Sequence, residues 1–298
     1  MNNAFHCRAA CWLNGKIVPP EQANISVFDH GLLYGDGVFE GIRFYRRRPF
    51  RLEAHLDRLF YSARAIALDL PWSRKELVSA VNETIAAYDN PEGYLRLVAT
   101  RGVGALGIDP RNCTAPSLFV IADALSLVAR ETREQGARVI VAATRRLPPD
   151  GLDPRIKSLN YLNHILARIE ATRAGADEAI LLNAAGRVAE GTADNVFVVR
   201  DGRLMTPPPM EGALAGITRE TVLELACAAG IPASETPLAP YDLYTADECF
   251  LTGTGAEMIP VAEVDGRRMN ACPGPVYREL NRRFRALVNT DNDSMNHA

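Results

Sequence analysis

The middle of the chain carries the stretch IKSLNYLN at residues 156–163, in which a lysine, Lys157, stands among apolar neighbours. Burial disfavours the ammonium form of a lysine and lowers its pKa, so the neutral amine can form an imine with an aldehyde. A carboxylate, Glu190, follows in the stretch EGTADN at residues 190–195. Pyridoxal phosphate is an aldehyde that needs such a lysine, an anion beside its ring nitrogen and a cradle for its phosphate. The two stretches therefore predict a site for this cofactor.

Composition narrows the class of partner. The 298 residues are 47% hydrophobic and 23% charged, as in ordinary soluble proteins, and the net charge of −3 argues against nucleic-acid or membrane-surface binding. The expected partner is a small molecule. No apolar run has the length of a signal peptide or a membrane span, so we expect a cytoplasmic protein. The six cysteines are scattered without zinc-finger spacing, so we expect no metal site and free thiols.

The length predicts about two domains of roughly 150 residues each. The N-terminal part, residues 1–125, is expected to be the smaller α/β domain, with an Asn-Gly hairpin at 12–18, strands at 38–45, 49–52, 93–101 and 116–122, and helices at 53–66 and 74–88. The polar stretch 126–136 is expected to be the interdomain linker. Residues 137–290 are expected to form the larger α/β domain, with strands at 138–143, 178–182 and 195–199 and helices at 161–174, 222–229 and 274–289. The tail, residues 291–298, is polar and is expected to be disordered.

Three side chains could complete the chemistry of the lysine, and each has a plainer interpretation. Tyr161 lies four residues after Lys157 and could reach the phenolic oxygen of the cofactor, or it could be a core tyrosine. Glu190 could pair with the ring nitrogen, or it could cap or solvate a turn. Arg58 could add a fixed positive charge for the phosphate, or it could form an exposed i, i+4 ion pair.

Two glycine-containing stretches are candidate anion sites. Residues 216–219, GITR, open an expected helix, whose first N–H groups and dipole favour an anion, although many such helix starts bind nothing. Residues 252–257, TGTGAE, follow the apolar strand Cys249–Leu251 and allow close backbone approach, although a plain strand-to-helix loop would look similar. The second stretch matches no nucleotide-binding motif.

Four stretches in register, IKSLNYLN, EGTADNVFVV, GITRE and LTGTGAEMIPV, together resemble the class IV (fold-type IV) pyridoxal-phosphate aminotransferases. The segment YGDGVFEGIRFY at residues 34–45 and the triplet Tyr94-Leu95-Arg96 are similar to the branched-chain amino-acid aminotransferase branch. The resemblance implies a two-domain α/β fold, a smaller N-terminal and a larger C-terminal α/β domain with the cofactor between them. It also implies at least a homodimer.

The resemblance also implies a role for individual residues. Lys157 would be the Schiff-base lysine and the proton shuttle, Glu190 would pair with the pyridine nitrogen, and Tyr161 would contact the phenolic oxygen. The residues implied in phosphate binding are Arg58, Ile217, Thr218 and Thr254. Those implied in lining the substrate pocket are Tyr34, Phe39, Gly41, Arg43, Tyr94 and Arg96. The turn at Thr254 and Gly255 would offer amides to the α-carboxylate of the substrate.

The implied reaction is transamination between L-leucine, L-isoleucine or L-valine and 2-oxoglutarate. Two features depart from the branched-chain pattern: the lysine-to-tyrosine spacing is four residues, as in the D-amino-acid branch, and Gly255 replaces a common alanine. The D-amino-acid branch typically carries an Arg-x-His carboxylate trap after the middle strand, whereas here Arg101 is followed by Gly102 and Val103, so the histidine is missing. The alternatives are a D-amino-acid aminotransferase, an R-selective amine transaminase, aminodeoxychorismate lyase and a non-catalytic pyridoxal-phosphate-binding protein.

Overall fold

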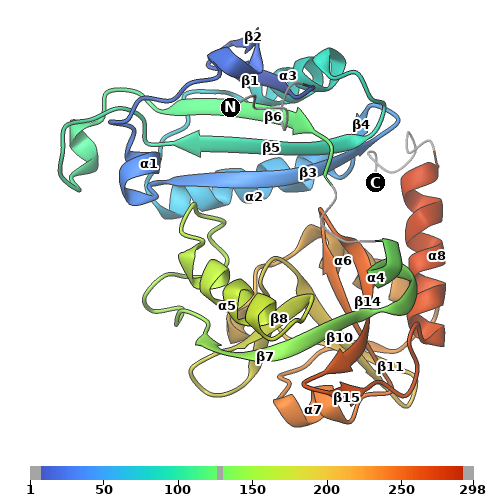
Figure 1. Ribbon diagram of the computed structural model, residues 1–298. Coiled ribbons are helices and arrows are strands. Elements are labelled where there is room, and N and C mark those ends of the chain that lie inside the picture. The colour runs from blue at the N-terminus through green and yellow to red at the C-terminus, as the bar shows by residue number, and fades with distance from the viewer. Residues whose placement is uncertain (1–7, 126–129, 291–298) are drawn as a thin grey trace. The chain divides into compact units, whose positions relative to one another are not determined.

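The structure is a computed structural model that describes residues 8–125 and 130–290 (Figure 1). The chain divides into two compact units: unit 1 comprises residues 1–126 and 156–161, and unit 2 comprises residues 127–155 and 162–298. Residues 156–161, with Lys157, thus belong to the first unit and not to the second, where the expected division had placed them. The expected linker contains helix α4 (Arg130–Gln135), and its residues 126–129, like the expected tail, lie outside the described residues.

Unit 1 is built on an antiparallel sheet of six strands in the order β2-β1-β6-β5-β3-β4. Its strands are β1 (Ala10–Leu13), β2 (Lys16–Val18), β3 (Gly37–Tyr45), β4 (Arg48–Pro49), β5 (Gly93–Thr100) and β6 (Ser117–Asp123). Its helices are α1 (His30–Tyr34), α2 (Leu52–Ala65) and α3 (Arg74–Ala87), of which α3 begins with a capping box between Ser73 and Glu76. The expected strand at 49–52 is shorter, because the chain turns at Phe50 and α2 begins at Leu52.

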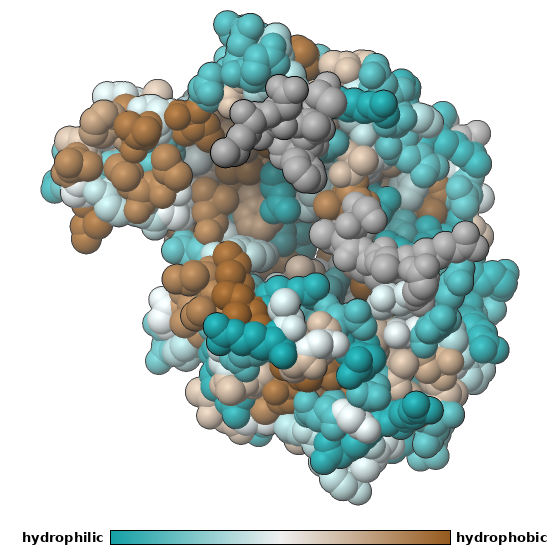
Figure 2. All heavy atoms as spheres, viewed as in Figure 1, coloured by the Kyte–Doolittle hydropathy of each residue, from teal (hydrophilic) through white to brown (hydrophobic). Residues whose placement is uncertain are grey.

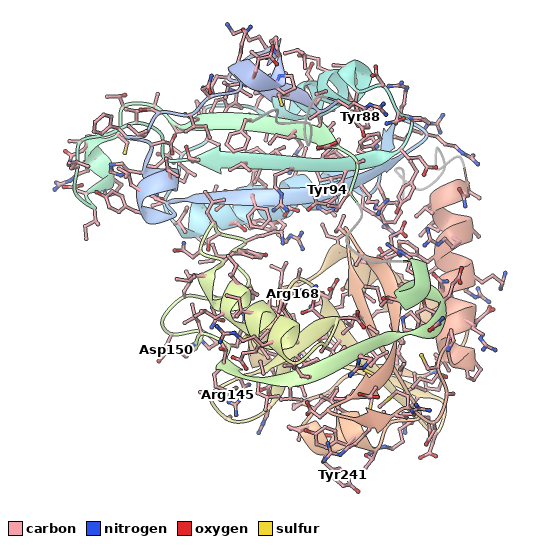
Figure 3. The ribbon with its side chains drawn as sticks, viewed as in Figure 1. Tyr88, Tyr94, Arg145, Asp150, Arg168 and Tyr241 are labelled. Atoms are coloured by element: carbon pink, nitrogen blue, oxygen red, sulfur yellow. The ribbon has the colours of Figure 1, made fainter. Side chains whose placement is uncertain are left out.

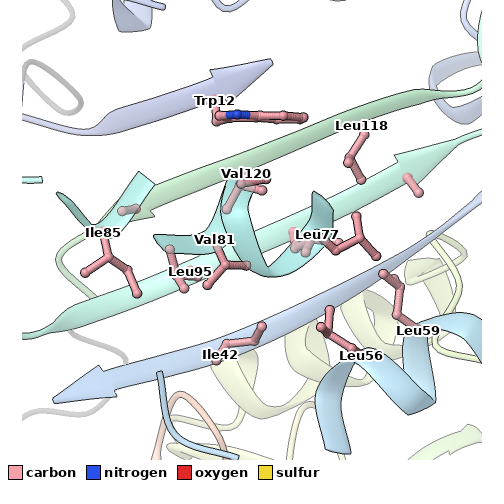
Figure 4. Close-up of a cluster of buried hydrophobic side chains, with 14 of the residues drawn as sticks. Trp12, Ile42, Leu56, Leu59, Leu77, Val81, Ile85, Leu95, Leu118 and Val120 are labelled. Carbon is pink, nitrogen blue, oxygen red and sulfur yellow. The ribbon is translucent and has the colours of Figure 1, made fainter. Parts of the chain in front are cut away.

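The two faces of this sheet differ in character. Side chains alternate between the faces of a strand, so Val38, Ile42 and Phe44 of β3 share the face that α2 and α3 cover. Figure 4 shows this apolar core, to which Leu56 and Leu59 of α2 and Ile42 of β3 belong. The opposite face of β3 and β5 therefore carries the intervening residues, which include most of the substrate residues expected from the sequence.

Unit 2 contains a mixed sheet of nine strands, with the path β12-β11-β10-β13-β14-β7-β8-β9 and β15 paired to β14. Its strands are β7 (Ala137–Arg145), β8 (Glu178–Leu182), β9 (Val188–Gly191), β10 (Asn195–Arg200), β11 (Arg203–Thr206), β12 (Ala233–Glu235), β13 (Glu248–Gly253), β14 (Glu257–Val264) and β15 (Arg267–Arg268). Its other helices are α5 (Leu162–Arg173), α6 (Ile217–Ala228), α7 (Pro240–Tyr244) and α8 (Pro275–Asn289). The α/β fold class expected from the sequence is confirmed.

The glycine-rich stretch after β13 connects two strands and not a strand and a helix. Gly253 pairs with Glu257, so the loop between β13 and β14 consists of three residues, Thr254 to Ala256. Glu257 closes this loop with φ at 63°, in the left-handed region. For a residue with a side chain this conformation costs roughly 1–2 kcal/mol, which is why glycine usually occupies it.

Helix α5 forms where the apolar periodicity predicts it, but its apolar stripe does not face the core of unit 2. The helix buries His164, Ala167 and Ala171. The stripe residues are exposed, and Figure 2 shows them as an apolar area over α5: Leu162, Ile165, Leu166 and Ile169. In the described ranges, no helix combines the length and apolar character that crossing a bilayer requires.

Candidate active site

Lys157 is attached to unit 1 through its backbone. Its carbonyl accepts a hydrogen bond from Phe39 N–H at 3.0 Å, and its own N–H donates to Ser62 Oγ at 3.1 Å. Its ammonium nitrogen lies 4.7 Å from the ring centroid of Phe39 and 3.4 Å from the hydroxyl oxygen of Tyr161. The amine therefore stands against two aromatic side chains, and the cofactor roles expected of Lys157 and Tyr161 stay predictions.

The face of the sheet opposite α2 and α3 carries four further predicted residues. Gly41 pairs with Arg96 and Arg43 with Tyr94 in the register of β3 and β5, so their side-chain positions share one face. The guanidinium of Arg96 lies 4.5 Å from the centroid of Phe39 and 5.5 Å from that of Tyr94, which is labelled in Figure 3. A Cβ atom at residue 41 would lie 1.9 Å from the Tyr94 hydroxyl, so only glycine lets Tyr94 occupy its place.

Arg58 is largely buried, and the alternative of an exposed i, i+4 ion pair is wrong. Its Nε and Nη2 donate to the two carboxylate oxygens of Glu40 at 2.7 and 2.8 Å. Glu40 also binds His55 Nδ1 at 2.7 Å, and the side chains of Glu40 and His55 are fully buried. Two nitrogens of the guanidinium are thus held by one carboxylate, which fixes its plane.

The charges of this cluster follow from its burial. Burial raises the pKa of Glu40, but the charges of Arg58 and His55 and their hydrogen bonds outweigh this and hold the pKa well below its usual range. Burial lowers the pKa of His55, and the nearby Glu40 offsets this only in part. Nδ1 of His55 faces Glu40, and its Nε2 has no hydrogen-bond partner within the described part of the chain.

Tyr34 is the last residue of α1. Its ring packs edge-on against His30, with centroids 4.9 Å apart, and its hydroxyl accepts a hydrogen bond from Gly107 N–H at 2.9 Å. The structure therefore connects Tyr34 to the segment 102–110.

Glu190 lies on β9 in unit 2, where it is buried in a polar network. One oxygen lies 3.0 Å from Arg146 Nε and 3.5 Å from His164 Nε2, and the other accepts a hydrogen bond from Leu214 N–H at 2.9 Å. Burial raises the pKa of Glu190, but the His164 hydrogen bond and the Arg146 charge outweigh it, so its pKa is lowered. Glu190 is therefore a buried carboxylate that stays ionised, suited to hold a proton on a partner nitrogen.

Unit 2 also presents the first candidate anion site. Helix α6 begins at Ile217 after the N-cap Gly216, and no side chain caps it. A Cβ atom at residue 216 would lie 1.9 Å from Asn195 Oδ1, so glycine is needed at this position. Asn195 pairs with Thr252, whose buried Oγ1 has no hydrogen-bond partner among the residues that the structure describes. The uncapped N–H groups of Ile217 and Thr218 fit a phosphate.

Pyridoxal phosphate fits the chemistry of these residues. Unit 1 supplies an amine against aromatic rings and a fixed guanidinium, and unit 2 supplies an ionised, buried carboxylate and an uncapped helix start. The orphaned Thr252 hydroxyl is the kind of buried polar atom that a bound group satisfies.

Sequence reasoning missed the residues that hold the predicted ones. Glu40 lies inside the quoted segment 34–45, and the period of two along a strand places it on the face opposite Phe39. A carboxylate on the apolar face of a strand could have indicated a buried partner such as His55 or Arg58. No sequence pattern links Arg146 or His164 to Glu190. Arg146 is 44 residues before Glu190 in the chain (190 − 146), and both residues meet Glu190 only in the folded unit.

Comparison with known proteins agrees with this chemistry. Residues 37–264 match the family model of the class IV aminotransferases. The branched-chain-amino-acid aminotransferase of Escherichia coli (strain K12) is 36% identical over 284 residues, covering 93% of this chain and 92% of that protein. The crystal structure of a branched-chain aminotransferase from Thermoproteus uzoniensis with norvaline gives a TM-score of 0.88 at 40% identity and covers 94% of both chains. A branched-chain aminotransferase from T.th., complexed with N-(5'-phosphopyridoxyl)-L-glutamate, gives 0.87 at 36% identity and covers 94% of this chain and 93% of that one.

Proposed function

The chain belongs to the class IV aminotransferases, and from this premise we propose that it transfers the amino group of L-leucine, L-isoleucine or L-valine to 2-oxoglutarate. The products are the branched 2-oxo acid and L-glutamate. Pyridoxal phosphate is the cofactor of this enzyme.

The residues of unit 1 are assigned to proton transfer and to substrate binding. When bound, pyridoxal phosphate would supply an electron sink for the α-carbon of the substrate and a carrier for its amino group. Lys157 would hold the cofactor as its covalent attachment point, and its free amine would take the proton from the α-carbon of the substrate as general base and carry it to C4′ of the cofactor. Tyr161 binds the phenolic oxygen, and Arg58, held by Glu40, binds the phosphate.

The residues of unit 2 are assigned to binding the ring nitrogen and the phosphate through fixed charges and N–H groups. Glu190, kept ionised by Arg146 and His164, holds the proton on the ring nitrogen. The N–H groups of Ile217 and Thr218 bind the phosphate together with Thr254, and the turn at Thr254 and Gly255 binds the α-carboxylate. An ionised, buried carboxylate counts against simple cofactor storage, which needs no electron sink.

The observation that carries the choice of substrate is the face formed by Phe39, Gly41, Tyr94 and Arg96. An aromatic wall accepts an aliphatic side chain, and a guanidinium stacked on that wall can pair with the distal carboxylate of glutamate or 2-oxoglutarate. The relatives support both halves of this assignment: one was crystallised with norvaline, an aliphatic amino acid, and another with a phosphopyridoxyl-glutamate compound.

The D-amino-acid branch is disfavoured by a specific contact. In that branch an arginine after the middle strand helps to trap the carboxylate, according to the resemblance. Here Arg101 donates from Nε and Nη2 to the two oxygens of Asp36 at 2.9 and 3.0 Å, and it also binds the carbonyls of Ile66 and Ala67. Arg101 is therefore held in a structural network.

The experiment that tests the proposal is a side-by-side comparison of amino donors with 2-oxoglutarate. L-leucine should give a higher kcat/KM than D-alanine or R-1-phenylethylamine. A preference for D-alanine would reassign the branch, and a preference for R-1-phenylethylamine would indicate an amine transaminase. Release of pyruvate from aminodeoxychorismate would indicate the lyase.

The proposed assembly is a homodimer or higher homo-oligomer. Unit 1 exposes an apolar group over α1 and the segment 102–110, seen in Figure 2: Val27, Phe28, Leu32, Val103, Leu106 and Ile108. Unit 2 exposes the stripe of α5. Exposed apolar groups of this kind mark interaction surfaces. Analytical ultracentrifugation tests the assembly, and cell fractionation tests the cytoplasmic location, which stays a prediction.

A further inference from the structure

Glu257 has an unfavourable backbone conformation. It closes the loop of Thr254, Gly255 and Ala256 in the left-handed conformation, where glycine is the usual residue. A glutamate that keeps this conformation needs a compensating interaction, and residues of this kind gather where function demands them.

The compensation comes from two arginines of different helices. Glu257 Oε2 lies 2.7 Å from Nη2 of Arg285 on α8 and 3.5 Å from Nη1 of Arg133 on α4. The carboxylate is 4% exposed, whereas Arg133 and Arg285 are 26% and 44% exposed. Figure 1 shows α4, α8 and β14 near one another within unit 2. Two guanidinium groups therefore approach this deeply buried carboxylate from different helices, which offsets the cost of burying its charge.

Arg133 also holds the loop directly. Its Nη1 donates to the carbonyl oxygen of Ala256 at 2.9 Å. Because a peptide unit is planar, fixing this carbonyl also fixes the Glu257 N–H of the same unit. The hydroxyl of Tyr277 donates to the carbonyl of Met258 at 3.2 Å, one residue further on. The C-terminal end of the loop is thus held by side chains of both helices.

We propose that Glu257 is a positioning residue for the α-carboxylate of the amino-acid substrate, acting through the turn at Thr254 and Gly255. Glu257, Arg133 and Arg285 keep the loop in one conformation, so its amides meet the carboxylate without a cost of ordering at each binding event. This inference rests on the proposed function, in which that turn binds the carboxylate.

The test measures the binding of two leucine analogues, each lacking one of the two functional groups, to the purified holoenzyme. The compound 4-methylvalerate keeps the carboxylate and lacks the amine, and 3-methylbutylamine keeps the amine and lacks the carboxylate. Binding of each is followed by the absorbance of the cofactor. Glu257→Gln should raise the Kd of 4-methylvalerate about tenfold, the size expected for one weakened charged hydrogen bond, and leave that of 3-methylbutylamine within about twofold. The same variant should raise the KM of L-leucine more than it lowers kcat.

The matched control is Glu263→Gln, which removes a carboxylate at the other end of β14, 3.6 Å from Arg138. This variant should bind both compounds like the wild type. Glu257→Gly is the second test variant, because glycine accepts the left-handed conformation without strain and removes the side chain with its carboxylate. It should weaken 4-methylvalerate as Glu257→Gln does.

Three outcomes would overturn the inference: wild-type affinity for 4-methylvalerate in Glu257→Gly, equal weakening of both compounds, or a KM for L-leucine that does not move. Failure of the proposed function is a separate result. In that case the wild-type protein itself transfers no amino group from L-leucine, whatever the variants do.

Discussion

Lys157 in unit 1 and Glu190 in unit 2 are the two groups expected to act on the cofactor, and their surroundings are opposites. The amine of Lys157 stands against the rings of Phe39 and Tyr161, and its backbone is held by hydrogen bonds to Phe39 and Ser62. The carboxylate of Glu190 is held at both oxygens by Arg146, His164 and a backbone N–H. A group that must form and break bonds needs room to move, whereas a fixed charge works best when it is held in place.

The largest expected effect comes from removing the moving group. Lys157→Ala should lower kcat by about 10⁴-fold or more, because it removes both the covalent attachment and the general base. Borohydride reduction of the wild-type holoenzyme followed by peptide mapping should place the cofactor on Lys157. The chain has only two other lysines, Lys16 and Lys75, so the mapping is unambiguous.

Lys75→Ala is the control for this experiment, since Lys75 lies on the exposed side of α3. It should keep wild-type turnover. Trapping on Lys16 or Lys75 would end the assignment of Lys157.

The second prediction removes the charge of the fixed group. Glu190→Gln should fold and bind cofactor but lose turnover, because the amide cannot hold a proton on the ring nitrogen. A fall of about two units in the pKa of that nitrogen corresponds to roughly 100-fold in kcat. The measurement is kcat with L-leucine, and Glu211→Gln, which removes a carboxylate bound to Arg187 at 2.9 Å, is the control. Turnover within about twofold of the wild type would exclude the electron-sink role.

The same contrast explains what the sequence could predict. The four quoted stretches predict the amine, the carboxylate, the helix start of α6 and the glycine-rich turn, because each is local and its spacing is visible in the chain. The partners that fix those groups were not predictable: Arg146 meets Glu190, and Arg285 meets Glu257, only through tertiary contacts. The periodicity of α5 predicts the helix correctly, but it cannot say that its apolar stripe is exposed.

The third prediction asks whether the face of unit 1 recognises the distal carboxylate. Arg96→Ala should weaken 2-oxoglutarate and glutamate far more than L-leucine, since a charged hydrogen bond is worth roughly 1.5–3 kcal/mol. The measurement is kcat/KM for each substrate in Arg96→Ala and, in parallel, in Arg43→Ala. Arg74→Ala, at a surface ion pair on α3, is the control. Equal losses for both substrate types would show that the arginine is structural.

The smallest expected effect concerns Asp194, a carboxylate close to the Glu190 region that no cation binds closely among the described residues. Burial, with the charges of Glu178 and Glu190, raises the pKa of Asp194 from 3.8 to about 7. Between these values the folded chain keeps a proton that the unfolded chain releases, so the free energy of unfolding falls as the pH rises. Asp194→Asn removes this dependence. The free energy of unfolding of Asp194→Asn minus that of the wild type, measured with urea, should be larger at pH 8 than at pH 5 by roughly 2 kcal/mol.

Two other buried carboxylates, Glu40 and Glu190, do not obscure this measurement. Glu40 and Glu190 have lowered pKa values, so the stability they contribute is present above their ordinary value of 4.5 and is lost only as the pH falls below it. Between pH 5 and pH 8 their contribution is constant. Asp150→Asn, at an exposed residue labelled in Figure 3, should leave the pH profile of the wild type unchanged. If the free energies of unfolding of Asp194→Asn and of the wild type change in parallel between pH 5 and pH 8, Asp194 is ionised over this whole range. The folded chain then keeps the charge of Asp194 buried near Glu190, and the prediction is wrong.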